Sequence, residues 1–346
     1  MRIAESKDNF WTSYRDWTGT GFRPDRPTAG HDCELHATAA ILSTGPVGLG
    51  DYIGMTNATL VQRLARTDGI LLRPDRPLAP MDVLVSGLVG VRGLANGARL
   101  WTTHASVAAE DPACPELVTT PTRRLVCHTG VDATRVTTVP AALNGLAAYL
   151  MQWIVMSVDV ASSFPVLVQD LYPSPLQLTP APALLYVRSW HQAQCINGSD
   201  AIASGCVSQV NLTSLGSSTA LFDARTDLAN ATSCEHCDHR FTLWQMYPSS
   251  GVAGEVIVLG DLEKTVPLSG YRFRLLAGRK DTLVVVGAPG EKVAITCLVR
   301  SSVGGQLAVH VVDVVLPASG RVTAALPTAP GHWWHFVARH GLLVCL

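Results

Sequence analysis

Two short segments concentrate the side chains that bind metals or act as nucleophiles. The first, residues 31–36 (HDCELH), holds two imidazoles, two carboxylates and one thiol. A zinc site would call for a motif such as H-E-x-x-H or a second ligand cluster nearby, and the sequence supplies neither. The spacing therefore favours a solvated loop or the start of a helix, and no metal site is predicted here.

The second segment, residues 234–239 (CEHCDH), is a CxxC pair with two interleaved histidines. A structural zinc site usually has a second ligand pair roughly 12–20 residues away, whereas the nearest outside cysteine, Cys206, stands alone. A disulfide within the pair, pairing to other cysteines, a metal site and a redox CxxC all stay open. The sequence favours disulfide use, and no cofactor is predicted.

Cys195 and Cys206 flank a stretch rich in Gly, Asn and Ser. A loop of this size and composition brings two Cβ atoms within reach of each other, so we predict a disulfide between them. The chain has nine cysteines, scattered rather than grouped as metal ligands. This distribution favours an oxidising compartment over the cytosol.

Four N-x-S/T sequons, at Asn57, Asn197, Asn211 and Asn230, predict N-glycosylation. A chain with this Ser and Thr content would carry about one by chance, so the excess favours secretion or residence in the secretory-pathway lumen. The opening MRIAESKDNFW lacks the apolar core and cleavage site of a signal peptide. We therefore expect that coding sequence precedes Met1.

Composition narrows the classes of partner. The net charge is −1 and no long basic stripe occurs, so nucleic acid is not an expected partner. The longest apolar window, residues 143–158, is shorter than the ~20 residues of a membrane span and is interpreted as buried structure. The glycine-rich stretches 45–50 and 287–292 match neither G-x-G-x-x-G nor the P-loop, and are interpreted as turns.

The elements that would carry these residues change in kind along the chain, which predicts a mainly β protein with an α/β N-terminal part. Before about residue 90, residues 59–66 have helical spacing behind a polar N-cap, and Gly69 follows them. Residues 37–42 fit a short buried strand or the end of a helix. Strand, loop and helix in this order are typical of the end of a βα series.

From about residue 95 onward, short β-rich runs are separated by Gly, Pro, Asn and Asp, which favours a sandwich or barrel. The Pro-rich stretch 172–182 is interpreted as a linker or an extended edge. The predicted strands are 100–106, 124–128, 152–160, 183–190, 255–259, 283–287, 292–299, 306–316 and 335–338.

Residues 37–82 resemble raffinose synthases and related glycoside hydrolase family 36 proteins. In that family A-x-x-x-x-G-G-P-[IV]-x-x-x-D precedes a helix, a D-G and L-R-x-x-x-P-x-x-P, and here STGPVGLGD leads to the helix, TDG and LRPDRPLAP. The resemblance implies that this G-P-V strand is the last of a (β/α)₈ barrel. It places Asp51 at the barrel's C-terminal face, where such barrels build their sites, and makes residues 7–11 the end of the preceding strand.

A second, weaker match covers residues 254–299, which look like the family's C-terminal β-domain with its V-P-x-S-x-x-R-F stretch and G-A-P-G-E turn. The two matches imply two domains. Residues 1–90 would be the last one or two βα units of a TIM-type barrel, and residues 91–346 a C-terminal β-sandwich-like domain.

Family 36 enzymes are retaining and use two aspartates on earlier barrel strands, and neither maps onto this chain. The leading hypothesis is therefore the C-terminal portion of a secreted glycosidase-like protein, inactive alone and associating with the missing N-terminal barrel portion. Trp11 and Asp51 would contribute to a sugar subsite. The rival is a non-enzymatic secreted carbohydrate-binding or interaction protein with an aromatic strip around Trp333 and Trp334. A glycan is the expected ligand in both cases.

Overall fold

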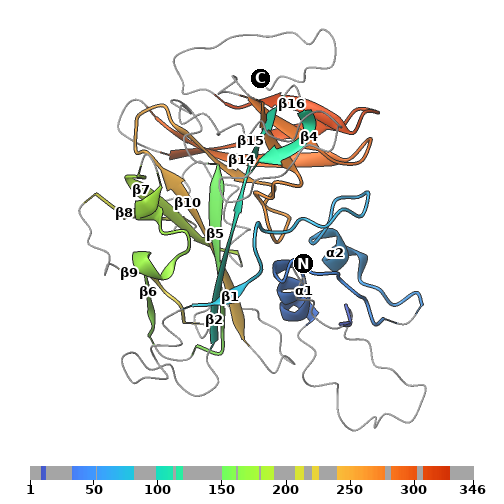
Figure 1. Cartoon of the computed structure of the whole chain (residues 1–346), viewed down its shortest axis with the longest axis horizontal. Helices are drawn as coiled ribbons and strands as arrows, with labels where there is room; N and C mark the ends of the chain where they lie inside the picture. Colours follow the sequence, from blue (N-terminus) through green and yellow to red (C-terminus); the bar gives the residue numbers. More distant parts are fainter. Residues whose placement is uncertain are drawn as a thin grey trace.

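The computed structural model describes thirteen stretches of the chain, and the mainly β character predicted from the sequence is confirmed in them (Figure 1). Two α-helices and sixteen strands lie within these stretches. They are residues 9–12, 33–51, 53–81, 99–111, 114–119, 150–160, 163–178, 181–190, 207–213, 220–225, 240–276, 282–301 and 307–327.

Both α-helices precede the sheets. Helix α1 (Cys33–Leu42) includes the 37–42 run, which is therefore helical rather than extended. Helix α2 (Ala58–Gln62) begins at the N-cap Asn57, whose side-chain Oδ1 accepts a hydrogen bond from the Leu60 backbone N at 3.2 Å. It ends four residues before the predicted boundary, because Ala65 pairs with Leu71 across a turn instead of continuing the helix.

A parallel bridge joins two chain segments on either side of α1. The Phe10 backbone N donates to the Gly48 O at 3.3 Å, and the Gly50 N donates to the Phe10 O at 2.8 Å, so that Phe10 pairs with Leu49. Parallel pairing needs a crossover connection, and α1 lies within that connection. The segments 9–12 and 47–51 are thus joined by a parallel bridge, with α1 between them in the sequence.

A six-stranded antiparallel sheet forms the centre of the molecule. All eight residues of its strand β5 are buried, because both faces of the sheet are covered. Its order is β1 (Ala79–Pro80), β2 (Arg99–Ser106), β5 (Met151–Val158), β10 (Phe241–Ser249), β7 (Leu184–Ser189) and β8 (Ser208–Asn211).

Three smaller sheets complete the β structure of the described residues. In these sheets β12 pairs with β3 in parallel, and the other described strand pairs are antiparallel. Two short 3₁₀ helices, η1 (Val168–Asp170) and η2 (Pro175–Gln177), follow β6. The sheets are β11 (Val256–Gly260), β14 (Lys292–Arg300), β15 (Leu307–Val315); β16 (Arg321–Ala325), β13 (Thr282–Val286), β12 (Phe273–Leu276), β3 (Ala108–Asp111), β4 (Cys114–Thr119); and β6 (Pro165–Leu167), β9 (Ala220–Asp223).

Each face of the six-stranded sheet packs on a different layer. On one face Ile154 and Leu243 share an apolar cluster with Phe10 and Ile41 of the N-terminal segment. On the other, Trp153 packs with residues of β6, η1 and β9. Figure 1 shows α1 on one side of the sheet and the β6–β9 pair on the other.

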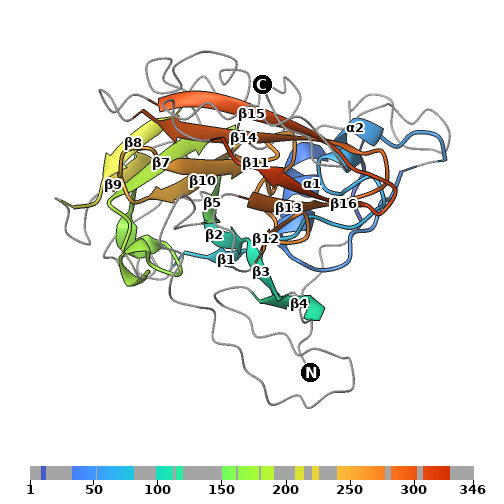
Figure 2. The same ribbon diagram turned by 90° about the horizontal axis from the view of Figure 1, so that it is seen from above.

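Strand β14 contributes to two apolar clusters because its side chains alternate between its two faces. Cys297 packs with residues of the five-stranded sheet such as Phe273, whereas Leu298 packs with Tyr186 and Tyr247 of the six-stranded sheet. Figure 2 shows β11, β14 and β15 stacked over β7 and β10. The three-stranded sheet is therefore covered by apolar side chains from both neighbouring sheets.

Seven predicted strands coincide with observed ones, namely β2, β5, β7, β11, β13, β14 and β15. The predicted runs 124–128 and 335–338 lie outside the described residues. Strand β10, at the centre of the largest sheet, was missed because Gln245 and Pro248 interrupt its apolar pattern. The Pro-rich stretch is more ordered than a linker, since η2 lies within it. None of the helices in the described stretches has the length and apolar character needed to cross a bilayer.

Candidate functional site

The two residues predicted to contact sugar lie beside the parallel Phe10–Leu49 bridge, and we call their positions the strand ends after the barrel interpretation. Asp51 follows the second strand end, and both of its carboxylate oxygens accept hydrogen bonds from Thr12: Oδ1 from the backbone N and Oδ2 from the hydroxyl, each at 2.7 Å. The Thr12 hydroxyl in turn accepts from the Asn57 backbone N at 2.6 Å. Thr12 is 1% exposed, so this buried hydroxyl joins both strand ends to the start of α2.

Trp11 stands beside this network. Its half-buried ring crosses the Gly50 backbone so closely that a Cβ at Gly50 would lie 2.8 Å from Trp11 Cδ1, and only glycine fits there. An indole with one part of its ring exposed suits the mixed C–H and hydroxyl surface of a sugar. The structure thus brings Trp11 and Asp51 to the same place, and adds Thr12, which sequence reasoning missed although it directly follows Trp11.

The other sequence-predicted sites are only partly described. Asn57 and Asn211 are exposed, and Asn211 Oδ1 accepts from the Thr213 backbone N at 2.9 Å and from its hydroxyl at 2.7 Å. The remaining predicted residues fall outside the described stretches: Asn197, Asn230, Cys195, Cys206, Cys234, Cys237, Trp333 and Trp334.

Among the described side chains, no group of three or more His, Cys, Asp or Glu residues is arranged to hold a metal ion. The Cys33 side chain is buried in α1, and Cys297 is a buried free thiol in β14. Burial raises the pKa of the Cys297 thiol to about 12. At neutral pH it is protonated and unreactive in the folded protein.

A buried ionic cluster joins the segment around α2 to the β sheets. Arg272 Nη2 lies 2.7 Å from Glu291 Oε1 and 3.8 Å from Asp261 Oδ2, and all three side chains are almost fully buried. Glu291 Oε1 also accepts from the Thr67 backbone N at 3.2 Å. Burial alone would raise the pKa of Glu291, but the hydrogen bond and charge of Arg272 hold it below its usual value. For Asp261, burial outweighs the attraction of Arg272 and raises the pKa.

Lys264 extends the same connection. Its ammonium donates to the carbonyls of Gln62 at 2.7 Å and Ala65 at 3.1 Å, the carbonyls at and just beyond the end of α2. A cation near a helix C-terminus is favourable because of the helix dipole. The Thr265 backbone N also donates to the Arg63 O at 3.0 Å. The segment from Asp261 to Arg272 thus contacts the region around α2 through charged side chains and backbone groups. We call this set of contacts the ionic seam.

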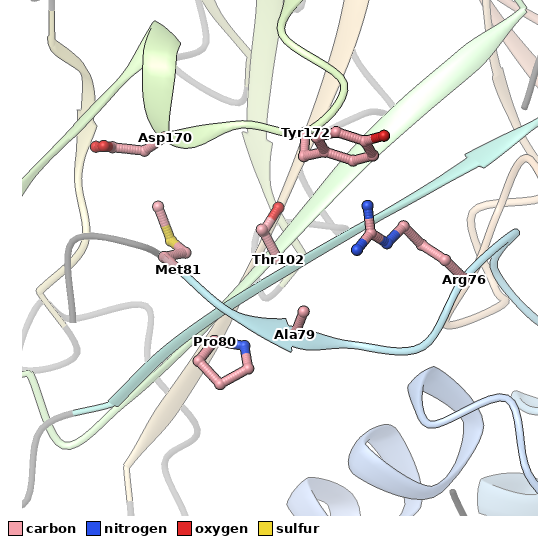
Figure 3. A pocket seen from close by; sticks show the side chains of 7 residues that line it. All are labelled: Arg76, Ala79, Pro80, Met81, Thr102, Asp170 and Tyr172. Atoms are coloured by element: carbon pink, nitrogen blue, oxygen red, sulfur yellow. The ribbon is translucent and has the colours of Figure 1, made fainter. Parts of the chain in front are cut away.

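A cavity of about 300 Å³ opens on the face of the central sheet that is turned away from α1 (Figure 3). We call it the β1–β2 cavity. Sequence reasoning missed it, although one wall belongs to the LRPDRPLAP run and another to the Pro-rich stretch. Its lining residues are Arg76, Ala79, Pro80, Met81, Thr102, Asp170 and Tyr172.

Backbone pairing holds the first wall of this cavity. Ala79 pairs with Thr102 across the β1–β2 ladder, and the Met81 N donates to the Leu100 O at 3.2 Å. Upstream, the Thr103 hydroxyl donates to the Arg76 O at 2.7 Å. Arg76 therefore emerges from a segment fixed to β2 and not from a free loop.

The second wall is anchored by side chains. Trp153 Nε1 donates to the Pro173 O at 2.8 Å, and Leu171 is buried against the sheet. The Asp170 carboxylate accepts from the Leu167 backbone N at 2.8 Å and so closes the turn of η1. Tyr172 itself is 57% exposed, and the Arg76 guanidinium lies 4.4 Å from its ring centroid. This is a cation–π arrangement that joins the two walls.

His104 lies beneath Tyr172, with 6.3 Å between the ring centroids. It is 1% exposed, and burial together with the charge of Arg76 lowers its pKa to about 4. The imidazole is therefore neutral at pH 7, even though Asp75 Oδ2 lies 3.9 Å from its Nε2. This histidine therefore adds no positive charge next to Tyr172 at pH 7.

No protein-family model matches this chain, and no curated protein matches it. The resemblance to family 36 consequently depends on the motifs quoted above, and the activity, the substrate and the two-domain division stay predictions.

Proposed function

We propose that this chain is a carbohydrate-binding portion of a secreted glycoside hydrolase family 36-like protein, with a barrel-derived βα unit in residues 1–90 and a β-sandwich-like domain in residues 91–346. Its ligand would be an α-galactoside or a similar glycan, bound at the two strand ends by Trp11 and oriented by Asp51.

The parallel Phe10–Leu49 bridge, with α1 between its two residues in the sequence, supports this proposal. In a βα barrel, residues just after the carboxyl ends of the strands line the site, and the position of Thr12 and Asp51 just after the bridged residues is consistent with this. The hydrogen bonds from Thr12 to both oxygens of Asp51 support an orienting role for this carboxylate rather than a role as nucleophile or acid. No pair of facing carboxylates of the kind used by retaining glycosidases is found there in the described residues.

The proposal predicts binding without hydrolysis. We expect the whole chain to bind raffinose or melibiose weakly, to lose that binding in Trp11→Ala, and to release no galactose from either sugar. Isothermal titration calorimetry and a galactose-release assay measure the two quantities. Turnover by the purified chain would sink the claim that it is catalytically silent, and unaltered binding by Trp11→Ala would remove the strand-end subsite.

Secretion and glycosylation belong to the same proposal. The exposed position of Asn57 and Asn211 supports modification at these two sequons. Expression of the chain behind a secretion signal, followed by removal of N-glycans, should lower its mass in discrete steps. A single unchanged mass would contradict the proposal of a glycosylated protein.

A second candidate function is a carbohydrate-binding or interaction protein that never takes part in catalysis. The β1–β2 cavity favours it, because this concave site lies on the β sheet and needs no barrel. Binding that survives Trp11→Ala would favour this candidate, and binding that responds to Trp333→Ala would assign it to the predicted aromatic strip.

A further inference from the structure

The loop that leads from Asp51 to α2 exposes apolar side chains. Ile53 is fully exposed, Met55 is 44% exposed, and Leu49, just before Asp51, is 40% exposed. Single apolar residues on a surface are ordinary, but several in one short loop concentrate apolar surface in water. Such a loop is either covered by another group or draws a second molecule onto itself.

The loop is compact because both of its ends are bonded to Thr12. The Thr12 hydroxyl donates to Asp51 Oδ2 at 2.7 Å and accepts from the Asn57 backbone N at 2.6 Å. Ile53 and Met55 thus belong to a short loop whose two ends meet at one buried hydroxyl. Asn57 lies at the base of this loop, so a bulky group on its side chain stands next to the exposed apolar residues.

Asn57 begins a sequon that the fold leaves open. Asn57, Ala58 and Thr59 are all exposed. Asn57 Oδ1 accepts the N-cap hydrogen bond from the Leu60 backbone N at 3.2 Å, whereas an N-glycan is attached to the other side-chain atom, Nδ2. The cap and the glycan are therefore compatible, and the cap fixes the direction in which the first sugar leaves the protein.

The second sequon in the described residues has a different setting. Its middle residue, Leu212, is 4% exposed, and Asn211 pairs with Leu184 in the last strand of the six-stranded sheet. The described stretch 207–213 contains none of the exposed large apolar side chains. A glycan on Asn211 has no apolar loop beside it, which makes this sequon the internal comparison for Asn57.

We infer that Asn57 carries an N-glycan that covers Leu49, Ile53 and Met55 and so keeps two copies of this chain from associating through the loop. N-glycans are bulky and solubilising, whereas an uncovered loop would remove its apolar area from water by packing against the same loop of a second copy. This inference rests on the proposed glycosylation. It depends neither on sugar binding by Trp11 nor on the family resemblance.

The attachment is a group transfer in the secretory pathway. A bond forms between Asn57 Nδ2 and C1 of an N-acetylglucosamine, and the amide loses one proton. The co-reactant is an oligosaccharide linked to a lipid diphosphate, whose C1–O bond breaks so that the lipid diphosphate leaves. The Asn57 Oδ1 takes no part in the new bond and remains the acceptor of the cap.

The test compares the secreted wild-type chain with variants made in the same glycosylating cells. Thr59→Ala removes the first sequon but keeps the cap, and alanine suits this helical position. Thr213→Ala removes the Asn211 sequon in the same way and is the matched control. The double variant Ile53→Ser/Thr59→Ala lacks both the glycan and the most exposed apolar side chain of the loop.

Peptide mapping by mass spectrometry shows which asparagines are modified, and light scattering at rising protein concentration measures association. We expect a glycan on Asn57, a single chain for the wild type and Thr213→Ala, and a rise toward the mass of a dimer for Thr59→Ala. The double variant should return to the mass of one chain. Enzymatic removal of the glycans leaves aspartate, itself a good N-cap, and should reproduce the association of Thr59→Ala. Thermal melts check that every variant is folded.

The contrary outcomes separate this inference from the proposal on which it rests. Unglycosylated chain that stays single overturns the inference, and so does association that Ile53→Ser leaves unchanged. Association of the glycosylated wild type or of Thr213→Ala also overturns it, because the loop is covered in both. Absence of a glycan from Asn57 alone overturns the inference and keeps the proposal of a glycosylated protein, whereas absence from every sequon removes both.

Discussion

Two buried threonine hydroxyls, of Thr12 and Thr102, differ in whether they have a hydrogen-bond partner. On the side of α1 and α2, the Thr12 hydroxyl donates a hydrogen bond to the Asp51 carboxylate. On the opposite side, the hydroxyl of Thr102 has no protein partner. A polar group satisfied within the chain stabilises the fold, whereas an unsatisfied one lowers stability and is available to a ligand.

The two hydroxyls therefore predict opposite changes in stability when they are removed. Asp51 was chosen from the sequence as a sugar contact. Both of its carboxylate oxygens accept hydrogen bonds from Thr12, so the carboxylate also holds the two chain segments together. Thr102, which no motif singles out, is one of several described residues with a buried polar atom that has no hydrogen-bond partner. The following predictions test the contrast, beginning with the largest expected change in stability.

Replacing Arg272 tests the ionic seam. Arg272→Met leaves two buried carboxylates, Glu291 and Asp261, without their cation, which should lower the free energy of unfolding by about 3–5 kcal/mol. Urea denaturation measures this loss. Lys292→Met, at an exposed position of β14, is the control and should change stability by less than about 0.5 kcal/mol. Equal effects would mean that the seam contributes no stability.

The buried His104 predicts a dependence of stability on pH. The folded pKa of His104, about 4, lies below the ordinary 6.5, so the unfolded chain binds a proton first as the pH falls. Above about pH 6.5 both states hold a neutral imidazole, and His104 does not lower the free energy of unfolding. Between about pH 6.5 and pH 4 the free energy of unfolding falls progressively, by about 3 kcal/mol in total. Urea titrations at several pH values should show this slope in the wild type and a shallower one in His104→Gln. Parallel curves would refute the neutral imidazole.

Thr12→Val tests the satisfied hydroxyl at the strand ends. It keeps the side-chain shape but removes the bond to Asp51 and leaves the Asn57 backbone N without its acceptor. We expect a loss of about 1–3 kcal/mol in the free energy of unfolding. A change below about 0.5 kcal/mol would show that water replaces the hydroxyl, and would weaken the assignment of a structural role.

Thr102→Val is the matched change on the other side of the sheet and should have the smallest effect, with the opposite sign. Since the hydroxyl makes no bond in the folded protein, replacing it by a methyl group should leave stability unchanged or raise it by up to about 1 kcal/mol. Chemical denaturation without sugar measures this. Destabilisation comparable with that of Thr12→Val would mean that the hydroxyl already has a partner.

The sequence predicted the strands with continuous apolar runs, such as β5 and β14, because burial on both faces leaves a local signature. It left residues 37–42 ambiguous, since an element that is apolar on all sides has no period to distinguish helix from strand. It missed β10 because Gln245 bonds Arg188 inside the sheet, a pairing that only the tertiary structure brings about.

The sequence singled out Trp11 and Asp51 because they lie in motifs with recognisable spacing, and their role in binding sugar stays a prediction. It did not single out the β1–β2 cavity. Arg76, Thr102 and Tyr172 come from three separate segments, which meet only because β1 pairs with β2 and Trp153 of β5 holds Pro173. No local pattern records such a meeting, so it appears only once the register of the sheet is known.

Because of its position, Cys297 can report how often the folded protein opens. Its thiol is 0% exposed in the sheet that lies between two others, and its pKa of about 12 leaves almost no thiolate at neutral pH. Alkylation at this residue therefore waits until the stacked sheets separate. The rate at which its peptide gains an alkyl group, followed by mass spectrometry without denaturant, reports the frequency of that opening.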